Sequence, residues 1–192
     1  MKLLISFFVL SMGQSFAHTI RQYPDAPLEI ITIGHPTLRL VAKEVELDEI
    51  QDGEFQAFAD DMIEKMRQAG GVGLAAPQVN VSKRMFVMKP SGLKSAEVVI
   101  NPTVEYLSDK GTKQSREGCL SIPGKTFKVK RFKEIHLSYY NRHGDHLTEQ
   151  AKGFRAIVIQ HEYDHLNGTM ISDFFTEMFD VKNDFEFVYP LM

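Results

Sequence analysis

The six residues from Gln160 to His165, Gln-His-Glu-Tyr-Asp-His, constrain this chain more than any other stretch. In a helix, His161 and His165 lie four residues apart and project from one face, so both imidazoles can reach a single metal ion. Glu162 stands beside them, where its carboxylate can act as a base. The stretch therefore predicts a helix that carries a metal site.

Apolar residues before the histidines support the helix. They continue the stripe that a helix presents to a core, at positions Phe154, Ile157 and Val158. Two histidines do not complete a catalytic site, because zinc or iron usually takes three protein ligands and leaves a position for water or substrate. The sequence therefore requires a third ligand from another segment.

Cys119 is the candidate for that third ligand. It stands among turn-forming residues between Glu117 and Gly124, and the chain has no second cysteine, so it forms no intrachain disulfide. Such a thiol is core filler, a nucleophile or a metal ligand. A lone cysteine is usually inert, but this one is the best candidate for the missing third ligand.

Length and charge limit the architecture and the partners. A chain of 192 residues with 43% hydrophobic residues is long enough for one compact domain. The net charge of -3 and the scattered basic residues argue against nucleic acid as a partner. We therefore expect one domain with no direct nucleic-acid binding.

The N-terminal residues resemble an export signal. Lys2 precedes an apolar run from Leu3 to Leu10, and Ser15-Phe16-Ala17 forms a small-x-small cleavage site before His18. The run is too short to span a bilayer comfortably, so we expect no transmembrane span in the mature protein. The alternative is an apolar extension that is retained. The expected organisation is a signal peptide at 1–17, a linker at 18–27 and a domain at 28–192.

Periodicity and turn residues predict an α+β order of elements. An amphipathic helix is expected over Glu54–Ala69, ended by Gly70-Gly71. Strands are expected at Leu28–Ile33, Arg84–Met88, Glu97–Ile100, Val104–Leu107, Phe127–Tyr140 and His146–Ala151, with the last two joined by a hairpin loop at Asn141–Asp145. Together with the HExxH stretch, this predicts antiparallel β-strands packed around a central metal-binding helix.

A glycine-rich stretch from Gly71 to Gln78 is a third notable segment. Its small residues let the backbone approach a ligand closely, and Gln78 offers both an amide donor and an acceptor. The stretch lacks the rest of a dinucleotide fingerprint or a phosphate loop, which excludes nucleotide binding.

Three motifs in this order, Gly71–Gln78, Glu117–Ser121 and Gln160–His165, resemble the signature motifs of the peptide deformylases. These metal hydrolases remove the formyl group from the N-terminal methionine of new proteins. The resemblance runs from about Leu28 to Asp173. It implies a deformylase domain with N-formyl-methionyl peptides or nascent chains, including those at the ribosome, as its substrates.

The resemblance assigns chemical roles to individual residues. It implies three metal ligands: Cys119, His161 and His165. Glu162 corresponds to the catalytic acid and base, while Gln78 and the backbone N–H of Leu120 correspond to the groups that hold the oxyanion. A thiolate ligand favours softer ions such as zinc or ferrous iron over magnesium. The family implies ferrous iron as the active metal, with zinc, nickel or cobalt able to occupy the site.

The resemblance also implies contacts with the substrate. Gly73 corresponds to a backbone contact, and the methionine pocket of the family corresponds to Val72, Glu117, Phe154, Ile157 and Val158. Glu117 also falls, with Arg131, where the family has a structural ion pair. The chain departs from the family at Thr126, where many relatives carry a basic residue that contacts the peptide.

Two other functions stay open at this point. An HExxH endopeptidase would need a downstream third ligand, for which Glu177 or Glu186 would have to serve. A non-catalytic module would bind formylated peptides or store metal, although binding alone needs neither Glu162 nor Gln78. The compartment is open too, because the family function implies the cytoplasm or an organelle, whereas the N-terminus resembles an export signal.

Overall fold

The computed structural model describes residues 23–24, 27–90, 92 and 94–180 of the chain, and the predicted signal peptide lies outside them. Two α-helices occur in this part, α1 (Gly53–Gln68) and α2 (Gly153–Leu166). The strands form two antiparallel sheets, which confirms the predicted α+β class. None of the helices described is long and apolar enough to cross a membrane.

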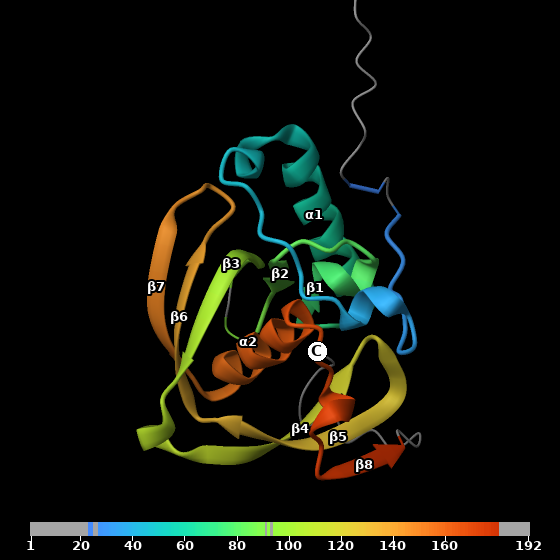
Figure 1. The fold of residues 1–192 in the computed structure, drawn as a ribbon, viewed down its shortest axis with the longest axis vertical. Helices are drawn as coiled ribbons and strands as arrows, with labels where there is room; N and C mark the ends of the chain where they lie inside the picture. The colour runs from blue at the N-terminus through green and yellow to red at the C-terminus, as the bar shows by residue number, and fades with distance from the viewer. Residues whose placement is uncertain (1–22, 25–26, 91, 93, 181–192) are drawn as a thin grey trace, which may run out of the picture.

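The larger sheet has five strands, and the smaller has three (Figure 1). In spatial order, the larger contains β1 (Gly73–Ala75), β2 (Met85–Met88), β3 (Glu97–Tyr106), β6 (Glu134–Tyr140) and β7 (His146–Lys152). The smaller contains β4 (Thr112–Cys119), β5 (Ile122–Phe132) and β8 (Glu177–Asp180). Strands β1 and β4 each have one strand partner in the residues described, so each is an edge strand.

The two faces of the larger sheet pack on different helices. Along β2, Met85 and Val87 join the cluster around α1, while Phe86 and Met88 join the cluster that contains the apolar residues of α2. Successive side chains of a strand point to opposite faces, so alternation along β2 directs them to two cores. This explains why all four residues of β2 are buried.

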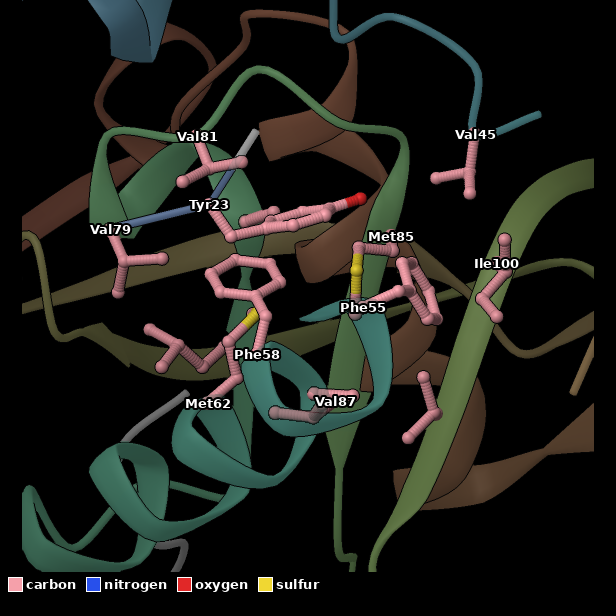
Figure 2. Packing of buried hydrophobic residues seen from close by; sticks show 14 of the residues in the cluster. Tyr23, Val45, Phe55, Phe58, Met62, Val79, Val81, Met85, Val87 and Ile100 are labelled. Atoms are coloured by element: carbon pink, nitrogen blue, oxygen red, sulfur yellow. The ribbon is translucent and has the colours of Figure 1, made fainter. Parts of the chain in front are cut away.

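The cluster around α1 includes a residue from the segment expected to be a linker. Tyr23 stacks on Phe58 with ring centroids 4.6 Å apart and meets Phe55 edge-on at 5.9 Å (Figure 2). Burying each phenylalanine contributes about 1.5–3 kcal/mol. The packed structure thus includes at least Tyr23 of the range 18–27.

Three strand predictions need correction. Leu28–Ile33 joins no sheet, because its backbone N–H groups donate to carbonyls of two different segments, from Ile31 to Gln78 at 2.8 Å and from Ile33 to Ser121 at 2.8 Å. A strand requires one continuous neighbour, and this segment has none. It is an extended strap between two parts of the molecule.

The strands predicted at Glu97–Ile100 and Val104–Leu107 are one strand, because Asn101-Pro102 does not interrupt it. Strand β3 continues through it to Tyr106, with a register irregularity between Ile100 and Thr103. Asn101 has a positive φ of 48°, and its side-chain amide bonds both the N–H and the carbonyl of Val45. A bulge absorbs the proline, so the sheet is not interrupted.

The single strand predicted at Phe127–Tyr140 is two strands in the structure. Strand β5 ends at Phe132 in the smaller sheet, and β6 begins at Glu134 in the larger one. Alternating apolar residues run through both, so their pattern does not reveal the change of sheet. The predicted helix over Glu54–Ala69 and the hairpin before His146 agree with the structure to within about a residue.

Candidate metal centre

Helix α2 carries the two histidines of the HExxH stretch. Gly153, with φ of 64°, is its first residue, and Gly168, with φ of 69°, follows its end. Gln160 joins the helix to the end of β5, because its side-chain amide donates to the Phe132 carbonyl and accepts from the Phe132 N–H, both at 3.0 Å. These contacts hold α2 against the smaller sheet, where Cys119 is the last residue of β4.

The structure brings Cys119, His161 and His165 together. One donor atom from each lies within 4.8 Å of the others, and all three residues are buried. Cys119 Sγ is 3.4 Å from His165 Nε2, and the imidazole rings meet at 68° with centroids 5.1 Å apart. The sulfur comes from the smaller sheet and both nitrogens from α2.

The chemistry of these donors fits a divalent ion. His161 Nε2 is buried without a hydrogen-bond partner in the part of the chain described. Burial holds the pKa of His165 well below its usual value, so the imidazole is neutral, as a metal ligand must be. Burial also raises the pKa of the Cys119 thiol to about 12, so its thiolate requires a nearby positive charge. One sulfur and two imidazoles suit zinc or ferrous iron and leave a coordination position open.

A buried charge network orients His161. Glu117 Oε2 lies 3.0 Å from His161 Nδ1, so the carboxylate accepts the Nδ1 proton and leaves the Nε2 lone pair facing the cluster. Arg131 donates to both oxygens of Glu117, at 2.9 and 2.7 Å, and to Asp164 at 2.6 Å. Although burial alone would raise it, the pKa of Glu117 is lowered to about 2, chiefly by Arg131. Glu117 is therefore a charged acceptor at neutral pH.

These contacts bear on two predictions about Glu117. The expected ion pair with Arg131 is present. Both carboxylate oxygens are bound by Arg131 and His161, and the place of Glu117 in the methionine pocket stays a prediction. The role of Asp164 is new, although the sequence held a signal for it: three residues after His161 on a helix, Asp164 reaches the same side.

Glu162 lies beside the two histidines on α2. Its side chain is fully buried, and neither carboxylate oxygen has a hydrogen-bond partner among the residues described. Burial raises the pKa of Glu162 well above its ordinary value, and the nearby Asp164 and Glu117 raise it further. Gly73 packs directly beneath it, where an added methyl group would overlap Oε1. An alanine there would therefore force the Glu162 carboxylate to shift, a constraint that the sequence did not reveal.

Gln78 approaches the cluster from the third motif. It lies in the short helix η3 (Ala76–Val79), and its Oε1 accepts the Ala75 N–H at 2.8 Å. Its Nε2 therefore faces Cys119 Sγ, at 3.8 Å, and the hydroxyl of Ser121, at 3.2 Å. Leu120 and Ser121 form the turn between β4 and β5. Ser121 was not among the predicted site residues.

The apolar residues assigned to the methionine pocket lie on α2 and just before β1. One hydrophobic cluster contains or contacts all four of them, namely Val72, Phe154, Ile157 and Val158. The same cluster includes Ala75 at the end of β1, next to the segment that carries Gln78. A hollow of about 510 Å³ lies elsewhere, on β3, β6 and β7, and contains none of the predicted site residues.

The other residues considered as possible metal ligands lie away from this cluster or outside the described part of the chain. Glu177 forms an exposed ion pair with Lys128 at 2.9 Å on β8 and is not in the cluster. Glu186 lies outside the described residues. His136, His143 and His146 are exposed, and His35 caps a short helix through Nδ1. Glu177 therefore does not supply the third metal ligand that an HExxH endopeptidase would need.

Comparison with known proteins agrees with this geometry. The model of the polypeptide deformylase family matches residues 27–179. The chain is 49% identical over 137 residues to a peptide deformylase of Fusobacterium nucleatum, covering 71% of this chain and 77% of that protein. It is 42% identical over 154 residues to the one from Pseudomonas aeruginosa, covering 80% and 89%.

Solved structures give the same result. The peptide deformylase of Thermotoga maritima superimposes with a TM-score of 0.72 and 39% identity, over 78% of this chain and 98% of that one. That of Synechococcus elongatus in complex with actinonin superimposes with a TM-score of 0.72 and 35% identity, over 81% and 82%. Both likenesses extend over most of each chain.

Proposed function

The chain belongs to the polypeptide deformylase family, enzymes that remove the N-formyl group from nascent chains with the help of a metal, and from this premise we propose how its residues share that reaction. The observation that carries the proposal is the meeting of Cys119, His161 and His165 beside Glu162 and Gln78. We assign the first three as the ligands of one divalent ion and α2 as the metal-binding helix.

The choice of metal is part of the proposal. Ferrous iron is proposed as the active ion, with zinc, nickel or cobalt able to take its place, because a thiolate with two imidazoles favours soft or borderline ions. When bound, such an ion lowers the pKa of water from about 15.7 to about 7 and polarises the formyl oxygen. Metal analysis of protein purified without oxygen tests the choice, and a predominance of magnesium would refute it.

Glu162 is proposed to move the proton. Its carboxylate takes a proton from the attacking water and later donates it to the amine nitrogen that leaves. A dry surrounding with no hydrogen-bond partner raises the affinity of this carboxylate for a proton, which suits a group that must hold one between two steps. Formate and a free N-terminal amine are the products.

Gln78 and Leu120 are proposed to hold the oxyanion. The Gln78 amide directs Nε2 toward Cys119, because Oε1 is already bound to the Ala75 N–H. The backbone N–H of Leu120 is the second proposed donor, from the turn that follows Cys119. Donors held in position before the reaction stabilise the developing charge without reorganising.

The peptide is proposed to lie between two sheet edges. Strands β1 and β4 are edge strands, one beginning at Gly73 and the other ending at Cys119. An extended peptide can add to such edges through its main chain. The methionine side chain is then directed to the cluster of Val72, Phe154, Ile157 and Val158, where each buried methylene contributes about 0.8 kcal/mol.

Formate release from a formyl-Met dipeptide is the test. We use protein purified without oxygen and loaded with iron or cobalt, beside Glu162→Gln, which keeps the shape of the side chain. The expected result is a fall in kcat of about 10²–10⁴ with the metal retained. The matched control is Glu134→Gln on β6, outside the cluster, which should leave kcat unchanged. Equal turnover by Glu162→Gln and the wild type would refute the assignment.

A further inference from the structure

Ser121 lies where the two segments with the proposed oxyanion donors meet. Gln78 belongs to η3, whereas Leu120 and Ser121 form the turn between β4 and β5. Ser121 is fully buried, and its hydroxyl oxygen accepts a hydrogen bond from Gln78 Nε2 at 3.2 Å. The hydroxyl thus connects the Gln78 amide to the turn that contains Leu120.

Hydrogen bonds at both ends determine how the Gln78 amide is oriented. A backbone N–H can only donate, so the bond from Ala75 N to Oε1 at 2.8 Å identifies which end of the amide is oxygen. Nε2 carries two protons. One is directed to the Ser121 hydroxyl and the other toward Cys119 Sγ, 3.8 Å away, which is one of the proposed metal ligands.

The main chains of Gln78 and Ser121 are held independently of that hydroxyl. The strap formed by Leu28–Ile33 donates from Ile31 N to the Gln78 carbonyl and from Ile33 N to the Ser121 carbonyl, each at 2.8 Å. Both backbones therefore keep their places when the hydroxyl is removed. Its loss should release the amide and leave the fold intact.

We propose that Ser121 is a positioning residue that orients the Gln78 amide toward the oxyanion, an inference that rests on the proposed function. Removing an oxyanion donor outright lowers kcat by about 10²–10³. Ser121→Ala keeps the donor and loses only one of its two anchors, so we expect a smaller fall in kcat, of roughly tenfold. KM should not change, because the oxyanion forms only as the reaction proceeds.

A double-mutant cycle tests the inference. Formate release is measured for the wild type, Ser121→Ala, Gln78→Ala and the double variant, with metal content and melting temperature for each. Because Ser121 acts through Gln78, the double variant should be no slower than Gln78→Ala alone. The control is Ser115→Ala, a buried serine of β4 outside the contacts of Gln78, which should leave kcat unchanged.

Several outcomes would overturn the inference. If Ser121→Ala lowers kcat by the same factor in the Gln78→Ala background as in the wild type, Ser121 acts independently of Gln78. Ser121→Ala could equal the wild type while Gln78→Ala is slow, which would refute this inference alone. A fall in kcat matched by loss of metal would indicate a structural role for Ser121. Absence of formate release by the wild type would refute the proposed function as well.

Discussion

Replacing Arg131 by methionine should destabilise the protein strongly. Arg131 is 4% exposed, and it is the partner of Glu117, whose side chain is 0% exposed. Methionine roughly preserves the volume but leaves Glu117 charged and buried. Breaking a buried pair in this way costs about 3–5 kcal/mol, against a usual total stability of about 5–15 kcal/mol. For a domain of this size, the melting temperature should fall by roughly 6–20 °C.

The assay is denaturant unfolding at pH 7 with a chelator present, so that metal binding does not add to the stability. Arg131→Met also leaves Asp164, its second partner at 2.6 Å, unpaired. Adding Glu117→Gln to Arg131→Met removes the more deeply buried of these two charges, and the amide oxygen can still accept from His161 Nδ1. The double variant should therefore be more stable than Arg131→Met alone. Arg67→Met is the matched control, because Arg67 pairs with Glu64 at 2.8 Å on the surface, and it should unfold like the wild type.

A free energy of unfolding of Arg131→Met within about 1 kcal/mol of the wild type, as for loss of a surface pair, would refute this prediction. A double variant no more stable than Arg131→Met would refute it too. A second readout is metal affinity. His161 loses a well-placed acceptor when Glu117 is released, so the affinity should fall by about 10–100-fold in the single variant.

Three further predictions concern other parts of the chain. Gly73→Ala should lower kcat while the protein stays folded, because the added methyl group displaces the Glu162 carboxylate; unchanged turnover in the formate assay would contradict this. Burial raises the pKa of Glu49, but its bonds with Lys83 and Tyr23 outweigh burial and lower it overall. Stability from a lowered pKa is present above the unfolded value of about 4.3 and is lost as the pH falls through the folded value. Unfolding curves of the wild type and Glu49→Gln should therefore differ at neutral pH and converge in acid; a constant difference would contradict the assignment. We also propose that residues 1–17 are removed on export, so N-terminal sequencing of protein from intact cells should begin at His18, and an intact Met1 would exclude cleavage.

Local features of the fold were predictable from the sequence. The helix over Glu54–Ala69 has a clear apolar stripe and a glycine stop, and it appears as Gly53–Gln68. The hairpin between β6 and β7 has a turn-rich loop and appears as expected. In both cases, the residues that decide the structure lie within a few positions of one another.

The errors arose where a distant segment decides the local structure. Leu28–Ile33 has strand composition, but its hydrogen bonds go to Gln78 and Ser121, and no pattern within the segment identifies those partners. Pro102 is a strand breaker by composition, yet Asn101 compensates by bonding Val45. The change of sheet at Lys133 is invisible in an alternation that continues on both sides.

By itself, the sequence determined the spacing of His161 and His165, the adjacency of Glu162 and the presence of one thiol, because these depend on covalent order and on the pitch of a helix. Only the tertiary structure decided that Cys119 meets the histidines, that Glu117 and Arg131 orient His161, and that Ser121 contacts Gln78. Such contacts join residues tens of positions apart. They depend on how whole sheets and helices pack, and the free energy of that packing is a sum over the chain that no single motif contains.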